Sequence, residues 1–443
     1  MAEVENQPAL EAGAAQVCIT PPVGTQLAGY FHQRVSESVR DDLFARALVL
    51  RQGNAAVALV SCDLICIEKG FAQPAKERIA ARTGIPPENV LLCATHTHTG
   101  PEVRPGRICE VNEPWLERLP GLIADAVVTA DQSRFAAQLS PARGSEGDLS
   151  FNRLFRMKDA TELFGRGPAG SAIGPAGGID PEVLVLKVSD SEGRPRAFVV
   201  NHALHVDVIG GGGGRFLSAD WPGEMARALS AIYGQDVVTL FLNGCCGDIN
   251  HVPHQPTSLP RSGPAKSVQL GRAFAGVAMN AAEKAEPVAV DRIAARLEEL
   301  AIPYYTRESA MRAYVDSLRE KPNRSDFEEY TIKAFDEWPL DGQMATVPVQ
   351  AFRVGEIAFV GLPGEIFVAH GLEVKKWSPA AFTFIAELAN DWFGYVPTTD
   401  QAERGAYGAR PILSRRLSSD AGRRMTDAIQ KALWKLWEED AGQ

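Results

Sequence analysis

The feature that most constrains the fold is a series of short apolar runs separated by stretches with helical periodicity. The apolar runs are typical of buried strands and cover Ala45–Leu50, Ala56–Ile65, Val90–Ala94, Val183–Val188, Ala197–Asn201 and Val237–Leu242. The helical stretches between them are Gly70–Thr83, Trp115–Asp131 and Trp221–Tyr233. Strands that alternate with helices predict the α/β class, here a layered α/β/α domain around a mixed, largely parallel sheet.

The second half of the chain predicts two more strand segments and three more helices. The strand segments are Asp291–Pro303 and Thr346–Leu362, and the helices lie near Arg307–Glu320, Ser325–Trp338 and Ser419–Glu438. The first two of these helices form a predicted helical insertion at about residues 304–340. Because no internal repeat appears, we expect a single domain over residues 15–443, preceded by a flexible N-terminus at residues 1–14.

Composition narrows the class of partner. The net charge is −10, and no Lys/Arg-rich stripe offsets it, which argues against nucleic acid. No apolar run approaches the roughly 20 residues that a membrane helix needs, and the acidic N-terminus lacks the pattern of a signal peptide. The seven cysteines show no CxxC spacing, which favours a reducing compartment. We therefore expect a cytoplasmic protein that acts on a small molecule without stable membrane association; the oligomeric state stays open.

Two of the apolar runs end in histidines. LLCATHTHTG ends in His96 and His98, and the run before NHALHVDVIG leads to His202 and His205. On an extended chain alternate side chains face the same side, so His96 and His98 can point into one cleft. Ligands in α/β sheets gather outside the carboxyl ends of strands. Half of the eight histidines follow two predicted strands, which indicates a metal site; buried histidines bonded to the backbone are the alternative.

A third run ends in FLNGCCGDIN, where small residues precede Asp248 and Asn250. Glycines at this place let the backbone approach a ligand closely. An ordinary Gly-Asp turn is the alternative interpretation. His251 and His254 follow directly, and we interpret them as exposed loop residues rather than ligands.

Two further strand ends carry oxygen donors. FVGLPGEIF places Glu365 at the start of a helical pattern, and ELANDWFGYVPT places Asp391 and Tyr395 after another apolar run. Glu365 suits a helix N-terminus electrostatically, so a capping role is one interpretation. The other interpretation is a zinc ligand, because catalytic zinc commonly takes two imidazoles and one carboxylate.

These motifs together resemble the N-terminal catalytic domain of the neutral/alkaline ceramidases. In chain order they are THTHTGP, FNR, NHALHVDVIG with SADWPGEM, GDIN, LPGE and NDWFGYVPT, and the opening segments ITPPVGTQLAGY and DDLFARALVL are also similar. The resemblance spans about Ile19 to Leu417. It implies a mononuclear zinc amidase that splits an N-acyl bond.

Mapped residue by residue, the resemblance also implies a site. The implied zinc ligands are His96, His205, Glu365 and Tyr395, with His98 contacting the reacting group and Arg153 of FNR orienting the substrate. Asp391 remains the alternative to Tyr395 as the fourth ligand. We expect His202 to support its strand through backbone hydrogen bonds, because residues three apart on a strand face opposite sides.

Two departures from the family concern the substrate. Asn250 follows GDI where ceramidases have a serine after GDV, so we expect it to position substrate or water, without the hydroxyl chemistry of serine. The chain also ends soon after the catalytic pattern, whereas ceramidases continue into an immunoglobulin-like domain. Both departures argue against ceramide as the substrate.

The resulting hypothesis is zinc-dependent hydrolysis of an amide bond in a small polar or amphipathic substrate. Zinc would lower the pKa of a bound water toward about 7, and the hydroxide would attack the carbonyl. His98 and Arg153 would stabilise the developing charge or move the proton. Asp63 and Asp220 would orient the ligating imidazoles or simply cap turns. The alternatives are a metal-dependent lyase or isomerase acting on a polar, sugar-derived substrate, and a non-catalytic metal-binding scaffold.

Overall fold

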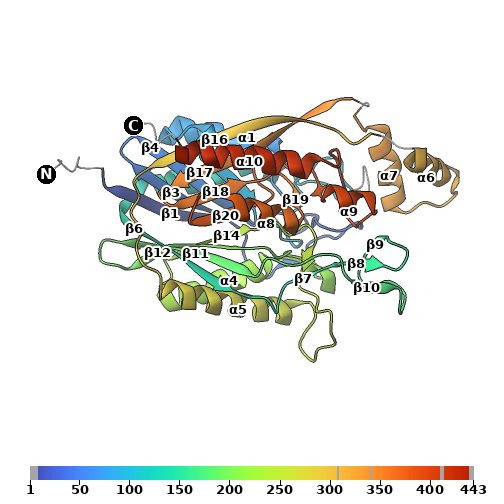
Figure 1. Ribbon diagram of the computed structural model, residues 1–443, viewed down its shortest axis with the longest axis horizontal. Helices are drawn as coiled ribbons and strands as arrows, with labels where there is room; N and C mark the ends of the chain where they lie inside the picture. The colour runs from blue at the N-terminus through green and yellow to red at the C-terminus, as the bar shows by residue number, and fades with distance from the viewer. Residues whose placement is uncertain (1–7, 307–308, 340–341, 410–413, 439–443) are drawn as a thin grey trace.

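The largest sheet has eight strands and contains most of the predicted apolar runs. The computed structural model describes residues 8–306, 309–339, 342–409 and 414–438 (Figure 1). In spatial order the strands are β14 (Val238–Asn243), β12 (Pro195–His202), β11 (Glu182–Asp190), β6 (Phe135–Ser145), β1 (Leu10–Cys18), β3 (Phe44–Gln52), β4 (Ala55–Cys62) and β5 (Val90–Ala94). The α/β class and a mixed sheet are confirmed.

The sheet is mainly antiparallel rather than largely parallel. Only its outermost pairs, β12 with β14 and β4 with β5, run parallel. The others pair antiparallel, and two of these pairs, β3 with β4 and β11 with β12, are joined by short turns, such as the one at Gly53 where φ is 57°. Strands β1 and β6 were not predicted, since LEAGAAQVC and FAAQLSPARGS mix small and polar residues and form no apolar run.

A second sheet closes the central core. It has four strands in the order β16 (Ile293–Pro303), β17 (Met344–Val354), β18 (Ile357–Gly361) and β20 (Phe382–Ala386). Leu48, Leu59 and Leu184 of the eight-stranded sheet share one buried cluster with Phe352 and Phe359 of the second sheet. The central core therefore lies between strand faces, and the layering includes sheet-on-sheet packing that the predicted α/β/α order lacked.

Helices cover the outer faces of the strands. The helices against the eight-stranded sheet are α1 (Lys69–Thr83), α3 (Leu119–Gln132), α4 (Asp220–Tyr233) and α5 (Pro264–Ala282), and those against the four-stranded sheet are α8 (Val368–Trp377) and α10 (Ala421–Glu438). Figure 1 shows α4 and α5 on the side of the molecule opposite α10. Within the described ranges, none of the helices has both the length and the apolar character needed to cross a bilayer.

The eight-stranded sheet curls so that distant strands approach each other. Strands β4 and β14 lie far apart in the strand order, yet the buried Ser61 hydroxyl of β4 donates to the Phe241 carbonyl of β14 at 2.6 Å. Because β5 is the neighbour of β4 and β12 is the neighbour of β14, the curl brings the ends of β5 and β12 together. These are the two strands that the histidine clusters follow.

Two outlying parts of the chain complete the description. Helices α6 (Ser309–Glu320) and α7 (Asp326–Asp336) lie between β16 and β17, and Figure 1 shows them at the end of the molecule away from the N-terminus. Strand β1 begins at Leu10, so the prediction of a flexible N-terminus is wrong for residues 10–14. Residues 1–7 of that prediction lie outside the described ranges.

Short elements position several of the predicted site residues. They are β2 (Ser38–Val39), β7 (Phe151–Asn152), β8 (Leu154–Met157), β9 (Glu162–Phe164), β10 (Ala172–Pro175), β13 (Phe216–Leu217), β15 (Ile249–Asn250), β19 (Glu365–Ile366), β21 (Tyr395–Val396), α2 (Glu113–Leu116) and α9 (Thr399–Glu403). Strand β19 pairs with β21 so that Glu365 lies beside Tyr395. Strand β15 pairs with β7 so that Asn250 lies beside Phe151.

Candidate metal centre

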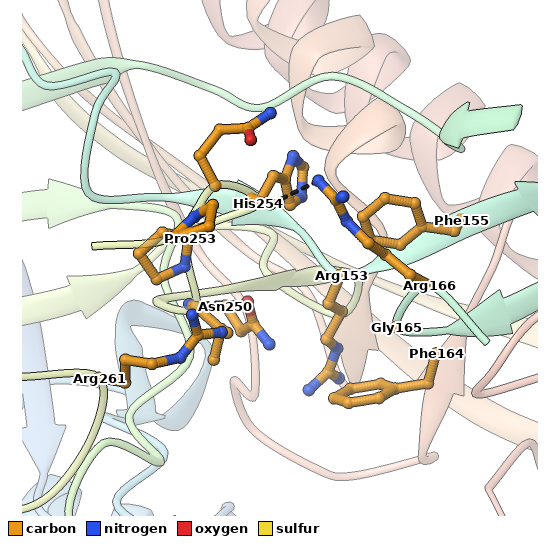
Figure 2. Close-up of a pocket in the computed structure, with 12 residues that line it drawn as sticks. Arg153, Phe155, Phe164, Gly165, Arg166, Asn250, Pro253, His254 and Arg261 are labelled. Atoms are coloured by element: carbon orange, nitrogen blue, oxygen red, sulfur yellow. Dashed lines mark hydrogen bonds between the residues drawn. The ribbon is translucent and has the colours of Figure 1, made fainter. Parts of the chain in front are cut away.

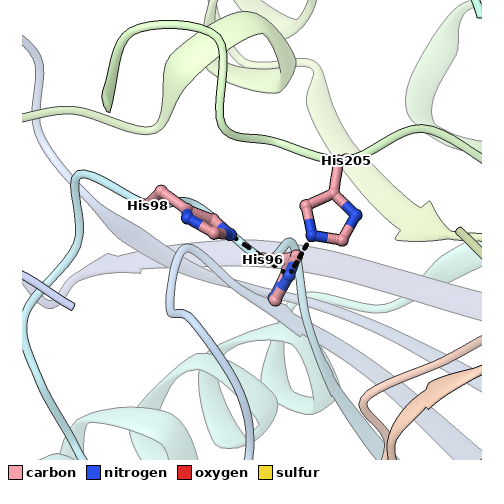
Figure 3. A group of neighbouring side chains, drawn as sticks. All are labelled: His96, His98 and His205. Atoms are coloured by element: carbon pink, nitrogen blue, oxygen red, sulfur yellow. Dashed lines mark hydrogen bonds between the residues drawn. The ribbon is translucent and has the colours of Figure 1, made fainter. Parts of the chain in front are cut away.

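Three imidazoles meet at the ends of β5 and β12. The Nε2 atom of His96 lies 3.0 Å from Nε2 of His205 and 3.3 Å from Nε2 of His98. All three residues are buried, and one ring nitrogen from each lies within 4.8 Å of the others (Figure 3). The structure thus brings together the two histidine segments that the sequence singled out.

Backbone carbonyls fix how the two central imidazoles are oriented. His96 donates through Nδ1 to the Ile65 carbonyl at 2.6 Å, and His205 donates through Nδ1 to the Cys246 carbonyl at 3.0 Å. A carbonyl oxygen only accepts, so each Nδ1 carries the hydrogen and each Nε2 presents a lone pair. Burial holds the pKa of His205 well below its usual range, which keeps this imidazole neutral. The two Nε2 atoms lie 3.0 Å apart with their lone pairs facing each other, an arrangement in which both can bind one cation.

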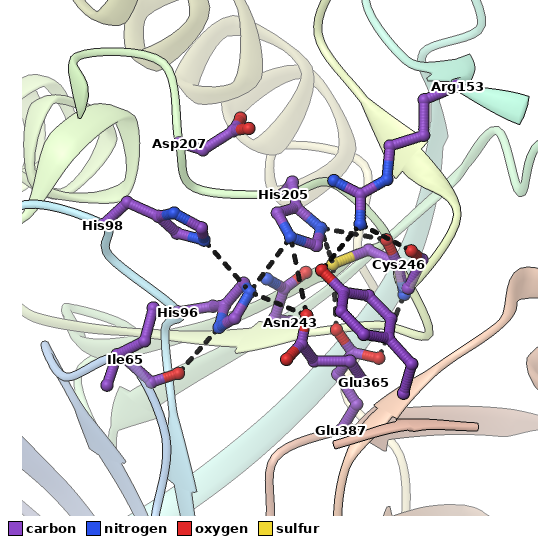
Figure 4. A network of polar contacts seen from close by, with 12 residues as sticks. Ile65, His96, His98, Arg153, His205, Asp207, Asn243, Cys246, Glu365 and Glu387 are labelled. Carbon is purple, nitrogen blue, oxygen red and sulfur yellow. Dashed lines mark hydrogen bonds and ion pairs between the residues drawn. The ribbon is translucent and has the colours of Figure 1, made fainter. Parts of the chain in front are cut away.

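Glu365 and Tyr395 face the same point from the other side. The Oε2 atom of Glu365 lies 3.5 Å from Nε2 of His96 and 3.8 Å from Nε2 of His205. Burial alone would raise the pKa of Glu365, but His96, His205 and a hydrogen bond from Tyr395 bring it below its usual range. The carboxylate is therefore ionised. Figure 4 shows His96, His205 and Glu365 converging, and two imidazoles with a carboxylate and a phenol suit a divalent cation.

Tyr395 and Asp391 have different surroundings. Tyr395 lines the cavity that holds His96, His98 and Glu365, with a volume of about 280 Å³. Asp391 instead accepts hydrogen bonds from the backbone N–H groups of Trp392 and Lys69, at 2.8 and 3.2 Å. The geometry favours Tyr395 over Asp391 as the oxygen donor beside Glu365.

His98 lines the cavity as a neutral side chain. Burial and the neighbouring His96 lower its pKa to about 3. Its ring packs against Gly29, where an added Cβ would lie 2.4 Å from Nδ1 of His98. Only a glycine fits at this point, and the φ of +98° at Gly29 also favours glycine.

We expect Gly29→Ala to displace His98 and to lower kcat by roughly 10²-fold, because small misplacements of catalytic groups have effects of that size. Metal content should remain that of the wild type, since the three atoms nearest to a Cβ added at Gly29 all belong to His98. Gly24→Ala is the matched control, because Gly24 has a similar φ of +96° and open space around it. Equal losses of kcat in the two variants would show that backbone strain, rather than His98, is responsible.

Arg153 joins the cavity from the segment between β7 and β8. It donates to the Gly247 carbonyl at 2.7 Å and to the Tyr395 hydroxyl at 3.0 Å. Its guanidinium also lies 5.2 Å from the ring centroid of Tyr407. Tyr407 lines the same cavity, and the sequence analysis did not identify it because no neighbouring motif marks this tyrosine.

Asp207 is a second cavity residue that the sequence analysis missed, although it lies in the quoted segment NHALHVDVIG. Its Oδ1 is 3.1 Å from Nδ1 of His251. Burial would raise the pKa of Asp207, but His251 brings it well below its usual range. The interpretation of His251 as exposed is wrong, since it is buried; His254 is half-buried and bonds to the Asn152 carbonyl at 2.8 Å.

Asn250 does not line the cavity that holds His96, His98 and Glu365, which we call the histidine cavity. It lines a neighbouring cavity of about 360 Å³, and Arg153 lines both. Its Oδ1 accepts a hydrogen bond from the Val252 backbone N–H at 3.0 Å. Arg153 and Phe164 line both cavities, whereas Asn250 lines only the neighbouring one.

His202 supports its strand, as the spacing predicts. Its Nδ1 donates to the Glu182 carbonyl at 3.0 Å, and its Nε2 accepts from the Ser150 hydroxyl at 2.7 Å. Both ring nitrogens are thus occupied by partners on the protein. The prediction that His202 forms backbone hydrogen bonds is confirmed.

The hydrogen bonds of Asp63 and Asp220 within the described residues go to groups other than the imidazoles. Asp63 pairs with Arg46 at 2.6 Å and accepts from the Phe44 backbone N–H at 2.9 Å. Asp220 accepts from the Ile209 backbone N–H at 3.0 Å, and burial raises its pKa to about 6. The carbonyls of Ile65 and Cys246 take the orienting role instead.

A buried glutamate behind the cluster holds two of its segments in place. Glu387 accepts hydrogen bonds from the backbone N–H groups of Cys246 and Ile366, at 3.1 and 2.7 Å, and from the Cys246 thiol at 2.9 Å. Burial, with a contribution from Glu365, holds the pKa of Glu387 well above its usual range. This side chain thereby fixes both the carbonyl that orients His205 and the residue next to Glu365.

The fold corresponds to a known class of structure, that of the neutral ceramidases. The crystal structure of neutral ceramidase from Pseudomonas aeruginosa matches with a TM-score of 0.78 and 17% identity, over 98% of this chain and 75% of that chain. A ceramidase complexed with C2 matches with a TM-score of 0.76 and 17% identity, over 98% and 76%. Neither protein-family models nor curated proteins match the sequence. The chain thus has the neutral ceramidase fold, which confirms at the level of fold the resemblance predicted from the motifs.

Proposed function

We propose that this protein is a zinc-dependent hydrolase that cleaves an amide bond in a small polar or amphipathic substrate. The observation that carries the proposal is the pair of imidazoles whose Nδ1 atoms are held by carbonyls and whose Nε2 atoms face each other 3.0 Å apart. In the reaction the bond between the acyl carbon and nitrogen breaks, and a water oxygen bonds to the acyl carbon. The products are a carboxylic acid and an amine, whose nitrogen takes a proton from the water.

His96, His205, Glu365 and Tyr395 would hold the metal. When bound, zinc lowers the pKa of water and polarises a carbonyl oxygen. The structural neighbours support an amide bond as the target, since both are ceramidases. Zinc fits the donor set better than magnesium or calcium, which prefer oxygen ligands alone.

The remaining cavity residues would bind and orient the substrate. Arg153 is buried and positively charged, and it lies beside Tyr395, where it can stabilise negative charge that develops on a substrate carbonyl oxygen. His98 is a neutral imidazole with its pKa lowered to about 3, so at neutral pH it can orient the substrate through a hydrogen bond but is a weak proton acceptor. Aromatic side chains, among them Tyr30, Phe31 and Trp392, would exclude water from this space.

The test combines elemental analysis with product analysis of an N-acyl substrate panel in ¹⁸O-labelled water. We expect one zinc per chain and one labelled oxygen in the released carboxylic acid. Protein without a stoichiometric transition metal would contradict the metal assignment. Conversion of a substrate without uptake of label would instead support the lyase or isomerase alternative.

Asn250→Ala should leave measurable hydrolysis, because Asn250 lines the neighbouring cavity and its Oδ1 is engaged by the Val252 backbone N–H. Loss of one hydrogen bond to the transition state typically lowers the rate by about 10²- to 10³-fold, and this sets the upper limit of the effect. Asn250→Ser should not by itself produce ceramide hydrolysis. Steady-state kinetics with metal-loaded protein check both variants; complete inactivity of Asn250→Ala at full metal content would make Asn250 essential.

A further inference from the structure

A second cavity adjoins the metal centre and carries three arginines. It has a volume of about 360 Å³ (Figure 2), and we call it the arginine cavity after Arg153, Arg166 and Arg261. Phe155 and Phe164 contribute aromatic walls. No aspartate or glutamate is among its lining residues in the described part of the chain, so its charge is positive.

Arg153 is the buried member of this group, with an exposed fraction of 6%. Its recorded hydrogen bonds go to uncharged oxygens, the Gly247 carbonyl and the Tyr395 hydroxyl. Its buried Nε atom has no hydrogen-bond partner, and no carboxylate lies within ion-pair distance of it among the described residues. Glu365 and Asp207 act on this guanidinium only from beyond ion-pair distance. Because a buried charge without a directly paired carboxylate is costly, it is suited to an anionic ligand.

The other two arginines approach from the loops around Arg153. Arg261 is exposed on the segment before α5, and within the described ranges it has no recorded ion pair or hydrogen bond. Arg166 donates to the His254 carbonyl and lies 5.5 Å from the Phe155 ring centroid. Figure 2 shows the side chains of Arg153 and Arg261 on either side of Asn250.

The arginine cavity and the histidine cavity share two lining residues, Arg153 and Phe164. A ligand bound in one therefore borders the other. Arg153 also donates a hydrogen bond to Tyr395, which we propose as a metal ligand. The two cavities together can hold an extended molecule with a reacting bond at one end and an anionic group at the other.

We propose that the arginine cavity binds the carboxylate of an N-acyl amino acid, with the acyl amide placed at the histidine cavity. The inference rests on the proposed amide hydrolysis and specifies its substrate class. Guanidinium groups pair with carboxylates in charge-assisted, often bidentate hydrogen bonds. Phe155 and Phe164 provide apolar surface for the amino-acid side chain, so an aromatic or aliphatic amino acid suits the cavity best. A neutral N-acyl lipid would leave all three guanidinium groups without a counter-ion.

The test uses N-acetyl-L-phenylalanine and its neutral analogue N-acetyl-L-phenylalaninamide, which differ only in carboxylate against carboxamide. Hydrogen bonds to charged groups contribute about 1.5–3 kcal/mol, so we expect kcat/KM for acetate release to favour the carboxylate by roughly 10- to 100-fold. In Arg261→Gln this preference should fall about tenfold, and Arg261→Lys should recover part of it. Arg423→Gln on α10, whose side chain is 67% exposed, removes the same charge elsewhere and should leave the preference intact.

Binding measured by calorimetry separates the failure of this inference from the failure of the proposed function. Tighter binding of the carboxylate than of the amide, lost in Arg261→Gln but not in Arg423→Gln, supports the arginine cavity even where neither compound is hydrolysed. Equal binding of the two compounds by the wild type overturns the assignment of the arginine cavity. An unchanged preference in Arg261→Gln at the wild-type Tm overturns it too. Hydrolysis of both compounds at equal rates would support the amidase proposal without the arginine cavity.

Discussion

Glu365→Ala is expected to abolish both metal binding and hydrolysis in a folded protein. The Glu365 carboxylate is the anionic group nearest to the facing imidazoles, 3.5 Å from His96 and 3.8 Å from His205. Its removal leaves the proposed site without its ionised ligand. Replacing even an outer partner of a metal ligand typically lowers metal affinity 10- to 100-fold, so the loss of a ligand should exceed about 10²-fold.

Elemental analysis after gel filtration, together with circular dichroism, checks this expectation. Glu387→Gln is the matched control, since Glu387 is also a buried glutamate next to the cluster, but its raised pKa favours the neutral acid, which glutamine imitates. This control should keep its metal, whereas His96→Ala and His205→Ala should lose it as Glu365→Ala does. Stoichiometric metal and full activity in Glu365→Ala would refute the assignment of the centre.

Asp63→Ala is expected to have the largest effect on stability among the predicted site residues. Asp63 is fully buried, and its partner Arg46 has a side chain only 8% exposed. Removing the carboxylate leaves the buried guanidinium without its ion-pair partner and also removes the acceptor for the Phe44 backbone N–H. Breaking one side of a buried ion pair usually costs about 3–5 kcal/mol of unfolding free energy.

Urea unfolding measures this loss, and the double variant Arg46→Met with Asp63→Leu provides the comparison. Replacing a buried ion pair by apolar side chains of similar size is often neutral, so the double variant should be more stable than Asp63→Ala. The folded fraction of each variant should still bind metal, because the hydrogen bonds of Asp63 come from Arg46, Phe44 and Thr95 rather than from an imidazole. An unfolding free energy of Asp63→Ala within about 1 kcal/mol of wild type would show that water solvates Arg46 or that another group pairs with it.

Much of the fold could be predicted from the sequence because most strands of the two large sheets contain apolar runs. Strand β5 coincides with the predicted Val90–Ala94, and helix α4 differs from its prediction by one residue at its start. Strands β1 and β6 escaped prediction because their side chains alternate between small and polar types. The packing of two sheets face to face depends on contacts between distant segments, such as Leu48 with Phe352, which local patterns do not encode.

The candidate site was predictable to the extent that its side chains end strands. His96, His205 and Glu365 were identified in this way, and the curl of the large sheet brings the two histidines together. The groups that orient the imidazoles were not predictable, because the carbonyls of Ile65 and Cys246 belong to the main chain and have no side-chain signature. A carboxylate is the common alternative for that role, which is why Asp63 was considered for it.

The use of main-chain oxygens to hold His96 and His205 affects how the site can change during evolution. Every amino acid offers the same carbonyl group, so the side chains at positions 65 and 246 are free to drift as long as the local backbone path survives. The orientation of the two imidazoles therefore does not depend on which side chains occupy positions 65 and 246. Neighbouring cavity walls can then be exchanged to suit new substrates without a change in the groups that orient His96 and His205.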